Sequence, residues 1–136
     1  MGTVIRSSIS SSNPYHISKH RFLELKHFCL QYPEWKQKAY SQIRTQGIRY
    51  DTPRSTGVSD PVVEAVARRE TYLKRMQLVE QTAVGTDPDI YEYLLKCVTL
   101  GYSYTYLKTY LDLPCGRDYF YERYRKFYYL LDKARE

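Results

Sequence analysis

Residues 103–131, SYTYLKTYLDLPCGRDYFYERYRKFYYLL, contain the clearest helical pattern in the 136-residue chain. In the second half of this stretch, four large residues follow one another at intervals of four, three and four: Phe120, Tyr124, Phe127 and Leu131. This spacing places the four side chains on one face of an α-helix. We therefore predict a helix from about residue 116 to residue 134, with that face in the core.

The first half of the stretch predicts a shorter helix followed by a turn. Ser103 is a favourable N-cap for this helix. We expect its inward-facing residues to be Leu107, Tyr110 and Leu111. Residues 112–116 then form a turn in which Leu113 is buried. A short helix, a tight turn with one buried apolar residue and a longer helix are the layout of a helix-turn-helix.

Burial of the apolar face turns a set of polar residues outward at the start of the longer helix: Arg117, Asp118, Tyr121, Glu122 and Arg125. These residue types suit base edges, because arginine pairs with guanine, a carboxylate accepts from cytosine, and tyrosine contacts a thymine methyl group. Three further basic residues suit phosphates: Lys108, Arg123 and Lys126. The pattern predicts binding to the major groove of double-stranded DNA.

The charge distribution leaves open a second interpretation, in which the outer face is only solvated. The chain has 21 basic and 15 acidic residues, and its net charge of +6 favours an anionic partner such as nucleic acid. Residues 87–136 carry eight of each sign, and the surplus lies in residues 17–49, with seven basic and two acidic residues. Within residues 116–126, four basic residues stand against two acidic ones. The start of the longer helix is therefore locally basic, and residues 17–49 are a further candidate for phosphate contacts.

The N-terminal part of the chain predicts a tail and two helices. Residues 1–16 are rich in serine and have too little apolar surface to form a core, so we predict a flexible tail.

Residues 17–31 form a helix capped by Ser18, with a buried face of Ile17, Phe22, Leu25, Phe28 and Cys29. The next helix begins at Tyr32 and ends at Gly47, and its buried residues are Trp35, Ala39 and Ile43.

Asp-Pro pairs at 60–61 and 87–88 predict two further helix starts, because aspartate caps a helix and proline suits its first turn. Residues 48–60 form a loop before the first pair. The first of these helices ends at Gly85, and its apolar stripe is Val62, Val66, Leu73 and Met76. We favour a core role for this stripe, with a homodimer contact as the alternative. The second helix ends at Gly101, and its apolar face is Ile90, Tyr93 or Leu94, Cys97 and Val98.

The predicted organisation is all-α, with a tail at residues 1–16, a helical region at 17–86 and the helix-turn-helix region at 87–136. No motif of an enzyme or of a phosphate-binding loop occurs, so we expect neither catalysis nor a cofactor. The N-terminal residues lack the apolar run of a signal peptide, and no stretch approaches about 18 uninterrupted apolar residues, so we expect a cytoplasmic protein without a membrane partner.

Histidine and cysteine form no ligand pattern. His16 and His20 are four residues apart, but no carboxylate or thiolate completes a set, so we expect no metal site. The cysteines, Cys29, Cys97 and Cys115, are odd in number and widely spaced, which argues against a disulfide framework. Cys115 stands at a helix start, where the pKa of a thiol can fall, and we predict a half-buried turn residue there rather than a nucleophile.

Three groups of residues, in this order and spacing, carry a resemblance to a known family. They are Tyr32-Pro33-Glu34-Trp35, Ser59-Asp60-Pro61-Val62, and a block from Leu113-Pro114-Cys115-Gly116-Arg117-Asp118-Tyr119-Phe120-Tyr121 to Arg125-Lys126-Phe127-Tyr128. Through them, the chain after about residue 20 resembles the RinA/ArpU-like family of phage-encoded transcriptional activators. The resemblance implies a sigma-factor-like helix-turn-helix that acts at phage late promoters in the cytoplasm of a Gram-positive host.

The resemblance also implies a recognition helix that begins near Gly116, which puts five residues over DNA: Arg117, Asp118, Tyr121, Glu122 and Arg125. The sequence departs from the common helix-turn-helix pattern at two positions. That pattern has alanine where Lys108 stands and glycine where Asp112 stands. These departures affect which residues of the longer helix would contact DNA.

Three functional hypotheses follow. The first is a promoter-binding regulator, a late-gene activator, with double-stranded DNA and host RNA polymerase as partners. The second is a small terminase subunit, a DNA-packaging protein that assembles into a ring through heterologous interfaces. The third is a module that binds RNA polymerase or another protein and binds no DNA. Stoichiometry separates the second hypothesis from the first, and binding to duplex DNA separates the third from both.

Overall fold

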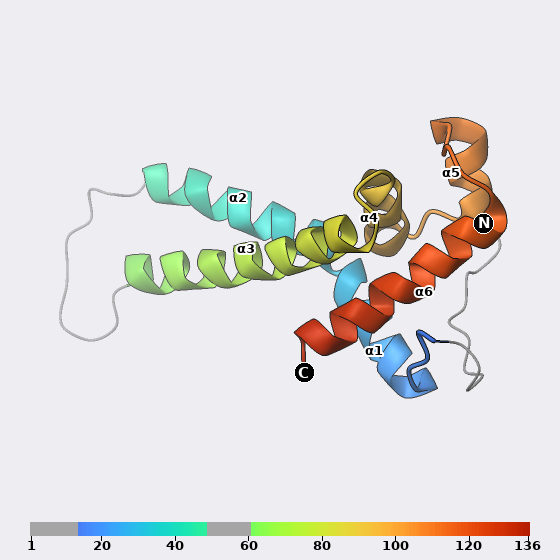
Figure 1. The fold of residues 1–136 in the computed structure, drawn as a ribbon. Coiled ribbons are helices and arrows are strands. Elements are labelled where there is room, and N and C mark those ends of the chain that lie inside the picture. Colours follow the sequence, from blue (N-terminus) through green and yellow to red (C-terminus); the bar gives the residue numbers. More distant parts are fainter. Residues whose placement is uncertain (1–13, 49–60) are drawn as a thin grey trace. The chain divides into compact units, whose positions relative to one another are not determined.

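The computed structural model describes residues 14–48 and 61–136, with the backbone alone for 42–48. These residues form six α-helices and no strand, which confirms the predicted all-α class (Figure 1). The helices are α1 (Lys19–Leu30), α2 (Tyr32–Ile48), α3 (Pro61–Thr86), α4 (Tyr91–Leu100), α5 (Tyr104–Leu111) and α6 (Arg117–Ala134). Residues 1–13 of the predicted tail and 49–60 of the predicted loop lie outside the described residues.

The helices divide into two compact units. The first unit contains α1, the part of α3 from Leu78 onward, and α4, α5 and α6. The second unit, Tyr32–Gln77, contains α2 and the preceding part of α3. The sequence predicted a boundary at residue 87. The difference arises because α1, which is distant in sequence from the C-terminal helices, packs against both α4 and α6.

The core of the first unit lies between α1, α4 and α6. Its fully buried side chains include Leu25, Cys29, Leu94, Val98, Phe120, Phe127, Tyr128 and Leu131. The ring of Phe22 meets the rings of Tyr124 and Tyr128 edge-on, with centres 6.3 and 5.1 Å apart. The predicted core face of α6 is confirmed, and Tyr128 is an additional core residue of that helix.

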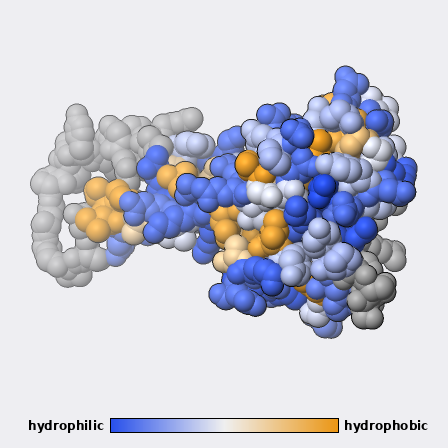
Figure 2. Space-filling view, viewed as in Figure 1, coloured by the Kyte–Doolittle hydropathy of each residue, from blue (hydrophilic) through white to orange (hydrophobic). Residues whose placement is uncertain are grey.

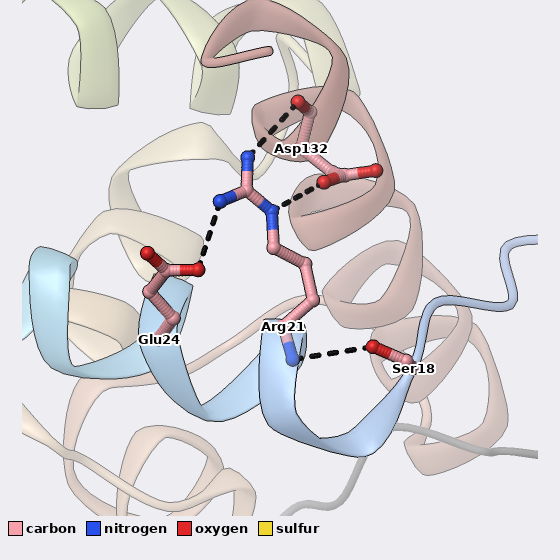
Figure 3. A network of polar contacts seen from close by, with 4 residues as sticks. All are labelled: Ser18, Arg21, Glu24 and Asp132. Atoms are coloured by element: carbon pink, nitrogen blue, oxygen red, sulfur yellow. Dashed lines mark hydrogen bonds and ion pairs between the residues drawn. The ribbon is translucent and has the colours of Figure 1, made fainter.

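An ion pair joins α1 to the C-terminal part of α6. Nε of Arg21 lies 2.5 Å from Oδ1 of Asp132, and Nη1 of Arg21 lies 2.9 Å from Oε1 of Glu24 (Figure 3). The hydroxyl of Ser18 accepts a hydrogen bond from the backbone N–H of Arg21 at 3.3 Å, which confirms Ser18 as the N-cap of α1. Charge and apolar packing therefore both hold α1 against α6.

Local signals in the sequence set the boundaries of α4 and α5. Gly101 has φ 77°, the left-handed conformation that glycine adopts readily, and it ends α4 as predicted. The hydroxyl of Ser103 accepts a hydrogen bond from the backbone N–H of Tyr106 at 3.1 Å and begins α5. The two-residue spacing between these caps makes the connection from α4 to α5 short.

The second unit contains Trp35 and Ala39 of α2 in buried positions, as predicted. The predicted core stripe of α3 is wrong at its first turns, where Val62 and Val66 are 57% and 40% exposed. Figure 2 shows apolar surface at this end of the unit. Met76 is the first residue of the stripe whose side chain is buried. Periodicity identified the apolar face of the helix, but it carries no information about how far along the helix a packing partner extends.

Several element boundaries differ from the predictions by a few residues. α2 and α3 each continue one residue past the glycine predicted to end it, Gly47 in α2 and Gly85 in α3. A glycine inside a helix costs only about 1 kcal/mol relative to alanine, so it need not end one. Tyr15, which was assigned to the tail, packs its ring against that of Tyr129 in α6, with centres 5.6 Å apart.

Candidate nucleic-acid interface

The turn between α5 and α6 contains one residue in the left-handed conformation. Asp112 has φ 58° and ψ 45° and directly follows α5. Such a residue redirects the chain at a helix end, and aspartate is among the few types other than glycine that adopt this conformation. Asp112 therefore supplies the backbone conformation for which the common helix-turn-helix pattern has glycine. Leu113 is 1% exposed, which confirms it as the buried residue of the turn.

Two side chains of α5 hold this turn. The ammonium group of Lys108 donates hydrogen bonds to the carbonyl oxygens of Leu113 and Cys115, at 3.1 and 3.3 Å. The hydroxyl of Tyr104 donates to the same Cys115 carbonyl at 3.4 Å. Lys108 was predicted to contact phosphate. Because an ammonium group has three donors and the turn uses two of them, one donor is left for an anion.

With the exception of Arg123, the predicted DNA-contacting residues of α6 lie on its outer side. Arg117 and Asp118 are exposed in the first turn of the helix. Four others are half-buried, namely Tyr121, Glu122, Arg125 and Lys126. No side chain caps the N-terminus of α6 at Gly116. The helix dipole places partial positive charge at this end, in addition to the charge of the basic side chains.

The Arg117 side chain lies against two tyrosine rings. Its guanidinium carbon is 4.8 Å from the centre of the Tyr104 ring and 5.7 Å from that of Tyr121. Its Nη1 also donates a hydrogen bond to the Tyr121 hydroxyl at 2.9 Å. The sequence placed Arg117 and Tyr121 on the same side of the helix, one turn apart. It gave no signal that Tyr104 of α5 forms the surface on which Arg117 lies.

Asp87 ties the connection between α3 and α4 to the first turns of α6. Its carboxylate accepts a hydrogen bond from the Tyr119 hydroxyl, and Nε of Arg123 lies 3.1 Å from its Oδ2. The prediction that Asp87 begins a helix is wrong, because α4 begins at Tyr91. Asp87 instead accepts the backbone N–H of Asp89 at 3.0 Å within the turn that precedes α4.

These contacts fix the charge of the Asp87 carboxylate. Burial alone would raise its pKa, but the hydrogen bonds from Tyr119 and the Asp89 backbone, together with the charge of Arg123, hold it below its ordinary value. Arg123 was predicted to hold phosphate, and the structure instead places its side chain against Asp87. The only signal for this site in the sequence was the Asp-Pro pair, whose usual meaning is a helix start.

Three tyrosines, one just before α5 and two along it, form a row of rings. The rings of Tyr102, Tyr106 and Tyr110 follow one another with centres 4.5 and 5.0 Å apart, and we call them the tyrosine row. Tyr106 is 41% exposed and Tyr110 is 70% exposed. The prediction that Tyr110 faces inward is therefore wrong. Tyrosine has an apolar ring and a polar tip, so it is a poor guide to the buried face of a helix as short as α5.

The described residues hold no cluster of metal-binding side chains. Burial raises the pKa of the Cys97 thiol to about 12 and also raises that of Cys29. Cys115 is half-buried, as predicted, and burial raises the pKa of its thiol. Within residues 14–48 and 61–136, no helix combines the length and the apolarity needed to cross a membrane.

Comparisons of the chain with protein-family models, with curated proteins and with solved structures find no match.

Proposed function

We propose that the chain is a DNA-binding regulator of transcription in which α5, the turn and α6 act as a helix-turn-helix. In this proposal α6 is the recognition helix, and its N-terminal half enters the major groove of double-stranded DNA. Arg117, Asp118, Glu122 and Arg125 face the bases, and Lys126 faces a phosphate. The neighbouring charge of Arg123 is already paired with Asp87 and holds the helix in place.

The observation that supports this proposal is the construction of the junction between α5 and α6. Buried Leu113, left-handed Asp112 and the two hydrogen bonds of Lys108 fix the turn. A fixed turn gives the start of α6 a defined direction, which recognition of base edges requires. The uncapped helix end and the cations on the outer side of α6 attract the phosphate backbone.

A salt titration with matched variants tests DNA binding. The full chain is titrated onto a fluorescently labelled duplex of mixed sequence, and anisotropy is measured at several salt concentrations. We expect Arg125→Ala and Lys126→Ala, made separately, each to weaken binding and to lower the slope of log affinity against log salt by up to about one. Lys133→Ala is the matched control, because Lys133 is exposed in the last turn of the same helix.

Two results would contradict DNA binding through α6. One is the absence of duplex binding by the unmodified chain at low salt. The other is a loss of affinity in Lys133→Ala as large as that in Arg125→Ala or Lys126→Ala, because a general effect of net charge would not distinguish the two ends of the helix.

The family resemblance extends the proposal to phage late promoters, with host RNA polymerase as a second partner in the bacterial cytoplasm. Light scattering of the full chain, alone and with duplex DNA, separates this function from that of a small terminase subunit. A monomer or a homodimer that binds DNA agrees with a regulator. The mass of a closed ring would contradict it.

The tyrosine row favours a second candidate function, which is binding to another protein. Tyrosine is enriched at protein interfaces, because its ring buries a large area at a low cost in side-chain entropy. The row itself is uncharged, which suits a protein partner better than a phosphate backbone. Purified bacterial RNA polymerase is the probe: we expect the unmodified chain to retain it and the double variant Tyr106→Ser, Tyr110→Ser to lose it with unchanged DNA affinity. Equal retention by both would contradict this function.

A further inference from the structure

We propose that Arg117 selects a guanine in the target duplex, and that Tyr104 and Tyr121 are positioning residues that hold its guanidinium group for this contact. This inference rests on the proposed function, since it assigns a base preference to the same surface. It names the specificity-determining residue of α6, and it gives Tyr121 an indirect role in place of the direct DNA contact predicted from the sequence.

The guanidinium group is held by two kinds of contact. It lies over the Tyr104 ring, 4.8 Å from the ring centre, and a cation in this position is attracted to the ring face. Nη1 donates to the Tyr121 hydroxyl at 2.9 Å, which limits rotation of the group over that ring. The two rings meet nearly at right angles, at 88° with centres 6.2 Å apart. The two rings therefore contact the guanidinium group from two directions.

Tyr104 is itself held in place, so its ring is a rigid surface for the guanidinium group of Arg117. The residue is 8% exposed, its ring packs 5.8 Å from that of Phe120, and its hydroxyl bonds to the carbonyl of Cys115. An arginine that is held before binding loses less side-chain entropy when it meets its partner. This ordering distinguishes Arg117 from a flexible surface cation that contacts phosphates as a point charge.

The free donors of Arg117 match guanine. A guanidinium group has five N–H donors in a planar fork, and the Tyr121 hydroxyl engages one of them. Among the described residues, no carboxylate forms an ion pair with Arg117. Guanine presents O6 and N7 as adjacent acceptors in the major groove, and a bidentate arginine contact to them is the commonest specific contact to a base. Arg117 is also the first residue of α6, and the N-terminal residues of a recognition helix are the ones that contact base edges.

The test is a selection of bound sequences from a random duplex library by the full chain, followed by affinity measurements on the selected duplex. We expect the selected duplexes to share a guanine. Replacement of this guanine by adenine should lower the affinity of the chain for the duplex about tenfold. Arg117→Gln removes the guanidinium fork, and glutamine pairs with adenine rather than with guanine, so the guanine duplex should lose its advantage over the adenine duplex. Tyr121→Phe should reduce the preference to about threefold at an unchanged melting temperature, because only the hydrogen bond that positions Arg117 is lost. Arg135→Gln is the control, because it removes an exposed arginine just past the other end of α6, and it should keep the full preference at that base pair.

The possible outcomes separate this inference from the proposed function. Absence of duplex binding by the unmodified chain overturns both. Duplex binding in which Arg117→Gln keeps the same guanine preference overturns the inference alone. The inference is also overturned if Arg117→Ala weakens all duplexes equally and lowers the salt slope by about one, because Arg117 would then be a phosphate contact.

Discussion

The hydroxyl of Tyr119, in the first turn of α6, donates a hydrogen bond to the buried carboxylate of Asp87, which lies just after α3. The same carboxylate oxygen lies 3.1 Å from Nε of Arg123, one helical turn further along α6. Asp87 thus binds two residues on one side of α6. Because these contacts lie in the first two turns, they help to hold the half of the helix that we propose for DNA binding.

Replacement of Asp87 by asparagine tests this contact through its dependence on pH. The pKa of Asp87 is lowered in the folded protein, so its charge contributes stability that is present above the unfolded pKa of about 3.9 and is lost as the pH falls through the lower folded pKa. We expect Asp87→Asn to lower the free energy of unfolding by about 2 kcal/mol at pH 7. The difference should shrink below about pH 4. Urea unfolding followed by circular dichroism at several pH values measures it.

The control for this variant is Asp89→Asn, which changes an exposed aspartate two residues away. We expect it to change the free energy of unfolding by less than about 0.5 kcal/mol at every pH. If Asp87→Asn shows the same small effect, or a cost that does not depend on pH, the ion pair with Arg123 does not stabilise the fold.

The features that were predicted correctly from the sequence are those that depend on residues close together in the chain. Ser18 and Ser103 cap helices through their own side chains, and Gly101 ends α4 because it adopts a positive φ. The core face of α6 follows from a regular spacing of large apolar residues. Leu113 is the one large aliphatic residue of the turn at residues 112–116, and its burial was predictable for that reason.

The features that sequence did not predict depend on distant parts of the chain. Asp87 meets α6 through a contact between residues 32 positions apart, and no periodic pattern reports such a pair. Tyr104 supports Arg117 from a neighbouring helix. The exposure of Tyr110 could not be inferred, because tyrosine is common both in cores and on surfaces. The candidate site is therefore predicted at the level of α6 and its outer face, while the roles of individual cations required the tertiary structure.

Truncation of the α6 core measures how much this helix contributes to stability. Phe120 and Phe127 are fully buried, so Phe120→Ala or Phe127→Ala should lower the free energy of unfolding by about 3–5 kcal/mol. Tyr110→Ala is the control from the helix before it, since this ring is 70% exposed and should cost less than about 1 kcal/mol. Chemical denaturation measures all three. A cost below 1 kcal/mol for both phenylalanine variants would mean that the buried face of α6 is assigned wrongly.

The reactivity of the three thiols should follow their burial. Cys29 and Cys97 are buried, and burial raises the pKa of both thiols, so neither should react with an aromatic disulfide reagent in the folded protein near pH 8. Cys115 is half-buried and should react first, although slowly, because its pKa is also raised. We expect Cys115→Ser to remove the reaction of the folded protein and all thiols to react after denaturation. A fast reaction that survives Cys115→Ser would show that one of the buried thiols is accessible.

Two glycine substitutions should change stability in opposite directions. Gly101 has φ 77°, where an alanine is strained, and Gly85 lies inside α3 with an ordinary helical conformation. A Cβ atom at either position would meet no atom within 4 Å, so packing contributes to neither change. We expect Gly101→Ala to lower the free energy of unfolding by about 1 kcal/mol and Gly85→Ala to raise it by about 0.5 kcal/mol, since alanine has less freedom to lose on folding. Urea unfolding of the two variants beside the unmodified chain measures both shifts. Equal shifts of the same sign would mean that the left-handed end of α4 is not maintained in solution.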